Sequence, residues 1–229
     1  MAIQLRSTKD VHASGVKALI YGAAGAGKTT LIKTMPKPVI LSAEGGLLSL
    51  ADADIPYIVI KDMDDLREAY RWAISEEANP FQTVALDSLS EIAEVVLHAE
   101  KAKAKDPRQA YSALIDTMAE MIRSFRDIPN KHVLFTAKIE KVQDENGRVL
   151  YGPSMPGNKL AQAIPYYFDL VFVLRVEKDD QGISHRALMT DTDGLWQAKA
   201  RTTQLNRLDF WEPADMGAVI AKLQGRSDG

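Results

Sequence analysis

Residues 18–30 read Ala18-Leu19-Ile20-Tyr21-Gly22-Ala23-Ala24-Gly25-Ala26-Gly27-Lys28-Thr29-Thr30. A short apolar run breaks into a glycine-rich turn and resumes as Leu31-Ile32, which predicts a strand, a phosphate-binding loop and a helix in succession. The glycines and the Lys-Thr pair fit the G-x-x-x-x-G-K-[ST] pattern, whose structural context is this strand and helix. The stretch therefore predicts an α/β nucleotide-binding protein with a mostly parallel sheet.

The chemistry of such a loop limits the residue types that can form it. Backbone N–H groups converge on the phosphates at a helix N-terminus, and glycine lets the backbone come close to the ligand. The Lys28 ammonium can reach the β- and γ-phosphates, and the Thr29 hydroxyl can hold Mg²⁺. ATP and Mg²⁺ are thus the expected cofactors. The expected nucleotide-binding residues are Gly22, Ala23, Ala24, Gly25, Ala26, Gly27, Lys28, Thr29 and Thr30.

Length and charge narrow the function class. The 229 residues, 46% of them hydrophobic, can form one large α/β domain, predicted over residues 16–229 behind an N-terminal arm of residues 1–15. The net charge of −3, from 28 basic and 31 acidic residues, provides no global attraction to nucleic acid. Any contact with DNA must therefore be local, or summed over an oligomer.

Cysteine, histidine and hydropathy argue against several other classes. Cysteine is absent, so disulfides and thiolate metal sites are excluded. The four histidines lack the spacing of metal ligands, and no apolar run approaches the ~18 residues of a membrane span. We expect a soluble protein of the cytoplasm that has no membrane partner.

Two further acids follow strands of the predicted sheet. Residues 38–42 form an apolar run that ends just before Glu44, and residues 83–86 form another that closes on Asp87. Ligands of open α/β sheets bind at the carboxyl ends of strands, so both carboxylates are candidates for the site. Asp87 is the expected second metal ligand, opposite Thr29.

The remaining elements follow from periodicity and breakers. Further strands are predicted at residues 56–60, 132–138, 168–175, 185–190 and 195–201, and helices at 30–35, 62–77, 88–100, 159–164 and 214–223. Leu114, Met118, Met121 and Phe125 mark the core stripe of one more helix. Asn146-Gly147 between alternating runs predicts a β-hairpin within residues 139–152, followed by a loop over 153–158. This excursion is either a ligand-responsive or partner-contacting element, or a plain surface feature.

Two groups of basic residues allow alternative interpretations. The segment 101–108 carries four cations and is either a solvated loop or a contact to a phosphate backbone. Lys199 and Arg201 lie two residues apart on a predicted strand, so they point to the same side. They either protect an exposed sheet edge from aggregation or serve a site.

The residue after Asp87 distinguishes classes of phosphate-loop protein. In AAA+ ATPases the equivalent acid usually continues directly to a catalytic glutamate, whereas here Ser88 follows. The carboxylate that activates water must come from elsewhere, and Glu44 is the best placed. This pattern resembles the RecA-like ATPases, and more closely the compact phage RecA-like ATPases of the Sak group, which act in single-strand annealing.

The resemblance implies a RecA-like α/β core, whose mostly parallel sheet is flanked by helices and carries antiparallel strands at the C-terminal end. It also implies a set of roles. Glu44 would activate the water, Lys138 would occupy the position of a γ-phosphate sensor that is Gln in RecA itself, and Lys199 and Arg201 would act in trans in a neighbouring subunit. Residues 140–158 would correspond to a DNA-binding loop, with 101–108 near another. The implied DNA-binding residues are Lys101, Lys103, Lys105, Arg108, Lys141, Arg148 and Lys159.

The implied function is a DNA-stimulated, Mg²⁺-dependent ATPase of phage recombination in the host cytoplasm. Its implied partners are single-stranded DNA, further copies of the chain in a ring or filament, and a single-strand DNA-binding protein. A nucleotide-gated helicase loader with little turnover is the alternative. A small-molecule kinase is disfavoured because the sequence shows no arginine-rich lid insertion.

Overall fold

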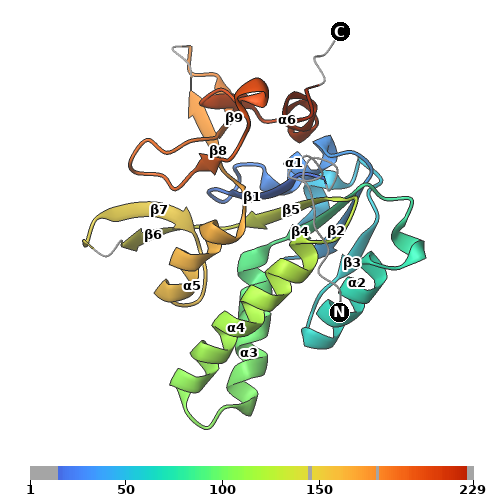
Figure 1. Ribbon diagram of the computed structural model, residues 1–229, viewed down its shortest axis with the longest axis vertical. Coiled ribbons are helices and arrows are strands. Elements are labelled where there is room, and N and C mark those ends of the chain that lie inside the picture. The colour runs from blue at the N-terminus through green and yellow to red at the C-terminus, as the bar shows by residue number, and fades with distance from the viewer. Residues whose placement is uncertain (1–14, 144–145, 179–180, 226–229) are drawn as a thin grey trace, which may run out of the picture.

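The computed structural model describes residues 15–143, 146–178 and 181–225 (Figure 1). Its strands are β1 (Lys17–Tyr21), β2 (Pro38–Ser42), β3 (Tyr57–Val59), β4 (Thr83–Asp87), β5 (His132–Ala137), β6 (Ile139–Gln143), β7 (Val149–Pro153), β8 (Leu170–Lys178), β9 (Ser184–Met189), β10 (Lys199–Ala200) and β11 (Trp211–Pro213). Its α-helices are α1 (Lys28–Leu31), α2 (Met63–Ala73), α3 (Leu89–Lys103), α4 (Pro107–Arg126), α5 (Asn158–Ala163) and α6 (Met216–Leu223).

The main sheet has the order β11-β9-β8-β1-β5-β4-β2-β3, and β10 pairs with β8 beside this path. Strands β8, β1, β5, β4, β2 and β3 run parallel, while β9, β10 and β11 are antiparallel additions near the C-terminus. Strand β5 lies between the loop strand β1 and the Asp87 strand β4. The predicted fold, a mostly parallel sheet flanked by helices with antiparallel strands at the C-terminal end, is confirmed.

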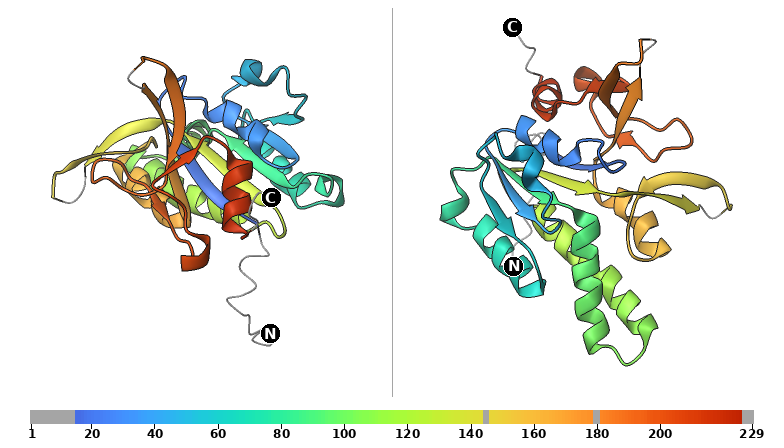
Figure 2. Two further views of the ribbon diagram at one scale, coloured as in Figure 1. Left: turned by 90° about the horizontal axis from the view of Figure 1, so that it is seen from above. Right: turned by 180° about the vertical axis from the view of Figure 1, so that it is seen from behind.

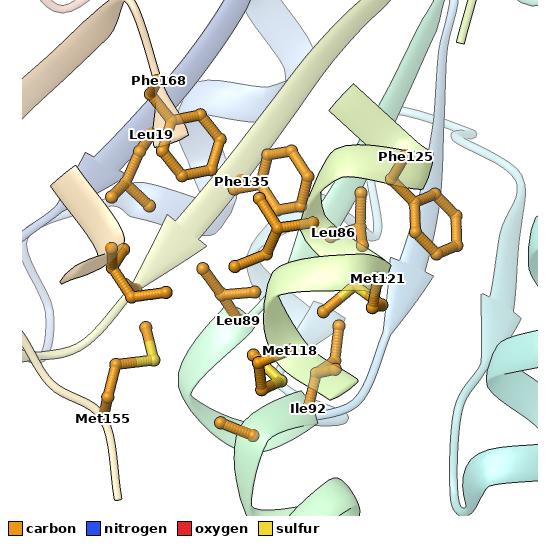
Figure 3. Close-up of a cluster of buried hydrophobic side chains, with 14 of the residues drawn as sticks. Leu19, Leu86, Leu89, Ile92, Met118, Met121, Phe125, Phe135, Met155 and Phe168 are labelled. Carbon is orange, nitrogen blue, oxygen red and sulfur yellow. The ribbon is translucent and has the colours of Figure 1, made fainter. Parts of the chain in front are cut away.

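Both faces of the sheet are covered, which is why the central strands are apolar runs without alternation. On one face, Leu19 and Phe135 pack against α3, α4 and Phe168 (Figure 3). On the other, Ala18 and Ile20 pack with residues of α1 and α6, which lie together on that side in Figure 2. The sheet is therefore a rigid base for the loops at its carboxyl edge.

Helices α3 and α4 form a long antiparallel pair that extends away from the sheet (Figure 1). The Ser88 and Asp106 side chains cap their N-termini by accepting backbone N–H groups, as the capping preference of Ser and Asp predicts. Three of the predicted DNA-binding cations, Lys101, Lys103 and Lys105, lie at the connection between the helices. No helix in the described residues is both long enough and apolar enough to cross a bilayer.

Some predicted boundaries are wrong. The predicted strand at 195–201 is reduced to Lys199–Ala200, because Leu195 and Gln197 exchange backbone hydrogen bonds with Tyr151 of β7 instead. The helix predicted at 30–35 begins earlier, at Lys28, and ends as a 3₁₀ turn, Ile32–Thr34. Strand β11 has no counterpart in the prediction, and residues 1–14 of the predicted arm lie outside the described residues.

His132 at the start of β5 makes folding stability depend on pH. Its Nδ1 accepts a hydrogen bond from the Val16 N–H at 3.0 Å, so this nitrogen is unprotonated. Burial, aided by the charge of Lys17, lowers the pKa of His132 below 6.5. The unfolded chain takes up a proton near pH 6.5, where the folded chain does not, so stability is lost as the pH falls through 6.5.

We expect the free energy of unfolding, measured with urea at pH 7.5 and pH 5.5, to fall more steeply with acid in the wild type than in His132→Gln. Glutamine keeps an acceptor for the Val16 N–H and has no proton to gain in this range. Background carboxylates titrate equally in both proteins, so parallel pH profiles would contradict this role of His132.

Candidate functional site

The phosphate-binding loop lies at the carboxyl end of β1, wedged between β8 and the start of α1. A Cβ at Gly22 would lie 2.6 Å from the Leu174 carbonyl oxygen of β8, so only glycine fits there. Gly27, immediately before α1, has a φ of 100°, a left-handed conformation that favours glycine. These two positions explain why the glycine pattern of the sequence is needed to form this turn.

Lys28 folds back over the loop. Its Nζ donates to the carbonyl oxygens of Gly22 and Ala23 at 2.9 and 3.0 Å. Burial lowers the pKa of this lysine, while the nearby carboxylates of Glu44 and Asp87 act in the opposite direction. The ammonium is thus held at the mouth of the loop, where phosphate oxygens could replace the two carbonyls.

Thr29 and Asp87, 58 residues apart in the sequence, are in contact. The Thr29 hydroxyl donates to Asp87 Oδ2 at 2.7 Å, because the end of β4 lies beside the start of α1. The Thr136 hydroxyl of β5 donates to the other carboxylate oxygen, Oδ1, and is fully buried. Asp87, itself buried, is therefore held from both sides.

The pair of Thr29 and Asp87 fits a magnesium ion by its chemistry. Hydroxyl and carboxylate oxygens are the hard donors that Mg²⁺ prefers, and it uses few protein ligands because it retains several waters. The two side chains already converge at 2.7 Å on the cavity beside the loop. These two residues would hold the ion, as the sequence predicts.

Glu44 follows β2 and lies at the edge of the same cavity. Its Oε1 is 3.6 Å from Lys138 Nζ, which forms a closer ion pair with Glu91 in the first turn of α3. The hydrogen bond to Glu91, more than the charge of Glu44, raises the pKa of Lys138. The structure thus brings together Glu44 and Lys138, which the sequence predicts as site residues, and adds Glu91 beside them.

The cavity at the loop has a volume of about 550 Å³. Residues from four separate regions line it: the loop itself, the segment after β2 with Glu44, the end of β4 with Asp87, and β9 with Arg186. A site of this size can take a nucleoside triphosphate, since ligand pockets span about 300–1,000 Å³.

Arg186 of β9 is a site residue that sequence reasoning missed. Its Nε donates to the Ala26 carbonyl at 3.0 Å, and a Cβ at Gly27 would lie 3.2 Å from the same nitrogen. Strand β8 continues past its pairing with Tyr21, and β9 returns antiparallel beside this extension. In the sequence, Arg186 is simply a basic residue within a predicted strand, and this pattern indicates no particular site.

Lys199 and Arg201 do not line the loop cavity. Their segment pairs with the first residues of β8, and Arg201 forms an ion pair with Asp169 at 3.1 Å.

The predicted DNA-binding residues lie in two separate regions of the structure. Lys101, Lys103, Lys105 and Arg108 lie at the α3–α4 connection, whereas Lys141, Arg148 and Lys159 lie on the β6–β7 hairpin and α5 (Figure 1).

Comparison with known proteins bears on the family and the fold of the chain. A family model described as "AAA domain" matches residues 14–202. No curated protein matches the chain. A solved structure described as a prototypical ATPase from the type III secretion system of pathogenic bacteria is similar with a TM-score of 0.50 at 15% sequence identity. The likeness covers 71% of this chain and only 52% of that one, and it bears on the fold alone.

Proposed function

The chain belongs to the AAA domain family, and we propose that it hydrolyses ATP as an oligomer that acts on single-stranded DNA. One observation carries the hydrolytic part: Lys28, Thr29, Asp87 and Glu44, from three strand ends, meet at one cavity beside the glycine-rich loop. The loop and Lys28 bind the triphosphate, with Lys28 exchanging its two carbonyl contacts for phosphate oxygens.

Glu44 is the general base of the proposed reaction. Its carboxylate lies at the cavity edge, where it can orient a water and accept its proton. Lys138 lies 3.6 Å from this carboxylate and can tune its basicity or contact the terminal phosphate. A bound Mg²⁺ would supply charge neutralisation of the phosphates. Thr29 and Asp87 would hold the ion, and Thr136 would keep Asp87 in place.

Arg186 supplies a second cation from the same subunit. Its Nε donates to the Ala26 carbonyl at 3.0 Å, and the residue lines the cavity. A fixed guanidinium can make paired hydrogen bonds to phosphate oxygens. The trans role of Lys199 and Arg201 stays a prediction, to which Arg186 adds a cation acting in cis.

The DNA part of the proposal is supported by the hairpin. The Ser154 N–H donates to the Lys138 carbonyl at 2.7 Å, so the segment after β7 is tied to a residue of the catalytic cluster. The cations Lys141 and Arg148 lie on or beside this hairpin. Strand annealing in phage recombination is the biological role that the sequence resemblance suggests.

The test is ATP hydrolysis with and without single-stranded DNA. We expect Mg²⁺-dependent turnover that rises several-fold with a long oligothymidylate, because ATP and DNA contact the same cluster through the hairpin. Absence of stimulation together with absence of DNA binding at low salt, where phosphate contacts are strongest, would reject the DNA part. Absence of turnover would reject the ATPase.

Replacement of Thr136 by valine tests whether the hydrogen bond from Thr136 positions the Asp87 carboxylate for Mg²⁺. Valine has a similar volume but donates no hydrogen bond, and a bond to a charged group contributes about 1.5–3 kcal/mol. We expect the Mg²⁺ concentration for half-maximal ATPase to rise roughly tenfold, with ATP binding in the absence of Mg²⁺ unchanged. A variant with normal Mg²⁺ dependence and only a lower melting temperature would show that Thr136 is purely structural.

A further inference from the structure

A second cavity, of about 810 Å³, lies apart from the nucleotide loop. Its walls come from the β6–β7 hairpin, α5 with the turn that follows it, and the segment that leads into β10. In Figure 1 these elements lie together on the left of the sheet. The volume falls within the range of ligand sites, about 300–1,000 Å³.

Two of the described residues that line this cavity are basic. Lys159 and Lys199 line it, and no aspartate or glutamate does so among the described residues. The chain as a whole carries a net charge of −3. Burial and the neighbouring Arg201 lower the pKa of Lys199, while the nearby carboxylate of Asp169 acts in the opposite direction. Two lysines in the wall of one cavity favour an anionic ligand.

An exposed aromatic ring lies beside Lys199. The Tyr166 side chain is 79% exposed, although a tyrosine gains stability by burying its ring. Lys199 Nζ lies 5.8 Å from the centre of this ring, in a cation–π arrangement. A flat ring beside a cation matches the two parts of a nucleotide, which stacks its base and presents a phosphate.

Gln197 gives the cavity an unsatisfied acceptor. Its Oε1 is buried and has no hydrogen-bond partner within the part of the chain that the structure describes, and the residue lines the cavity. Leaving such a buried atom unpaired is destabilising. If the Gln197 side-chain amide rotates toward the cavity, it can form hydrogen bonds with the edge of a nucleotide base, which offers both donors and acceptors.

The backbone of the cavity wall is joined to the nucleotide loop. The hydroxyl of Tyr21, the residue just before Gly22, lies 2.9 Å from the Tyr151 carbonyl oxygen and 3.0 Å from that of Gln197. Tyr21 is fully buried, so these contacts are shielded from water. A ligand that moves residue 197 would thus act on the start of the loop.

We propose that this cavity binds one unpaired nucleotide unit, with its base stacked on Tyr166 and its phosphate held by Lys159 and Lys199. The inference rests on the proposed function, because the expected source of this unit is single-stranded DNA. It assigns Lys199 to the ligand of its own subunit in place of the trans role. A free mononucleotide has the same chemistry and is the other possible source.

The experiment measures binding of fluorescent oligothymidylate by anisotropy, with a non-hydrolysable ATP analogue saturating the loop. Base stacking on an aromatic ring contributes about 1–3 kcal/mol, so Tyr166→Ala is expected to weaken binding roughly 5- to 150-fold. Tyr166→Phe keeps the ring and is expected to bind normally. Tyr57→Ala, which removes a tyrosine that is 57% exposed on the edge strand β3, is the matched control.

Competition with free dTMP shows whether the nucleotide unit in the cavity comes from single-stranded DNA or from a free mononucleotide. If dTMP displaces the oligomer only at far higher concentration, and Tyr166→Ala weakens both, the polymer is the ligand. If dTMP binds as tightly as the oligomer and remains sensitive to Tyr166→Ala, the cavity takes free nucleotide. In either case a 5-iodouridine probe is expected to crosslink at Tyr166.

Three outcomes overturn all or part of the inference in distinguishable ways. Normal oligomer binding by Tyr166→Ala, with no crosslink at Tyr166, rejects the cavity while the DNA part of the proposed function stands. If wild-type protein binds neither oligomer nor dTMP, both the cavity and the DNA part are rejected. Recovery of Lys199→Ala ATPase on mixing with Lys28→Ala would return Lys199 to the trans role.

Discussion

Glu44→Gln is expected to reduce ATP hydrolysis by about 10²–10⁴-fold, the contribution of a general base, and to leave ATP affinity within a factor of two or so. Glutamine keeps the size of the side chain at the cavity edge but cannot accept the proton of the attacking water. Single-turnover hydrolysis and titration with a fluorescent ATP analogue measure the two effects separately.

Two matched variants show whether the loss of hydrolysis is specific to Glu44. Lys28→Ala removes the cation at the mouth of the loop and is expected to lose ATP binding itself, by roughly 10- to 150-fold for one or two charge-assisted contacts. Glu68→Gln alters an exposed glutamate of α2 and is expected to change neither quantity. Hydrolysis that is insensitive to Glu44→Gln would reject Glu44 as the base and favour the helicase-loader alternative.

The strands around the nucleotide site could be predicted closely from the sequence. Residues 38–42 and 83–87 are strands β2 and β4 with the predicted bounds, because both are buried on two faces and therefore form continuous apolar runs. The glycine pattern placed Lys28 and Thr29, and a carboxylate at the end of β4 is brought to them by the parallel order of the sheet. Local patterns sufficed there because each side chain lies at a strand end or in the loop.

The supporting residues could not be predicted in the same way. Thr136 lies inside an apolar run, and only the alignment of β5 beside β4 puts its hydroxyl on Asp87. Glu91 looks like an ordinary first-turn helix acid until β5 places Lys138 beside it. The predicted strand at 195–201 was wrong because residues 195–197 pair with β7, a contact between segments far apart in the sequence.

Arg186→Ala is expected to weaken ATP binding by roughly 10- to 150-fold, the contribution of one or two hydrogen bonds to a charged phosphate. The guanidinium lines the loop cavity and its Nε is fixed by the Ala26 carbonyl at 3.0 Å. Arg186→Lys keeps the charge but lacks the planar fork, so we expect it to recover only part of the affinity. The loss should be larger for ATP than for AMP, because the effect acts through the phosphate chain.

Mixing experiments separate this cis residue from a trans one. Arg186 and Lys28 serve the same loop, so a mixture of Arg186→Ala with Lys28→Ala contains no intact site and is expected to stay inactive. Arg201→Ala mixed with Lys28→Ala is expected to regain activity if Arg201 acts on a neighbouring subunit. Arg67→Ala, which breaks an exposed ion pair with Asp64, is the control for loss of a surface arginine. Unchanged ATP affinity in Arg186→Ala, with only a lower melting temperature, would reduce Arg186 to a brace for the loop, because its Nε bond to Ala26 would then be its whole role.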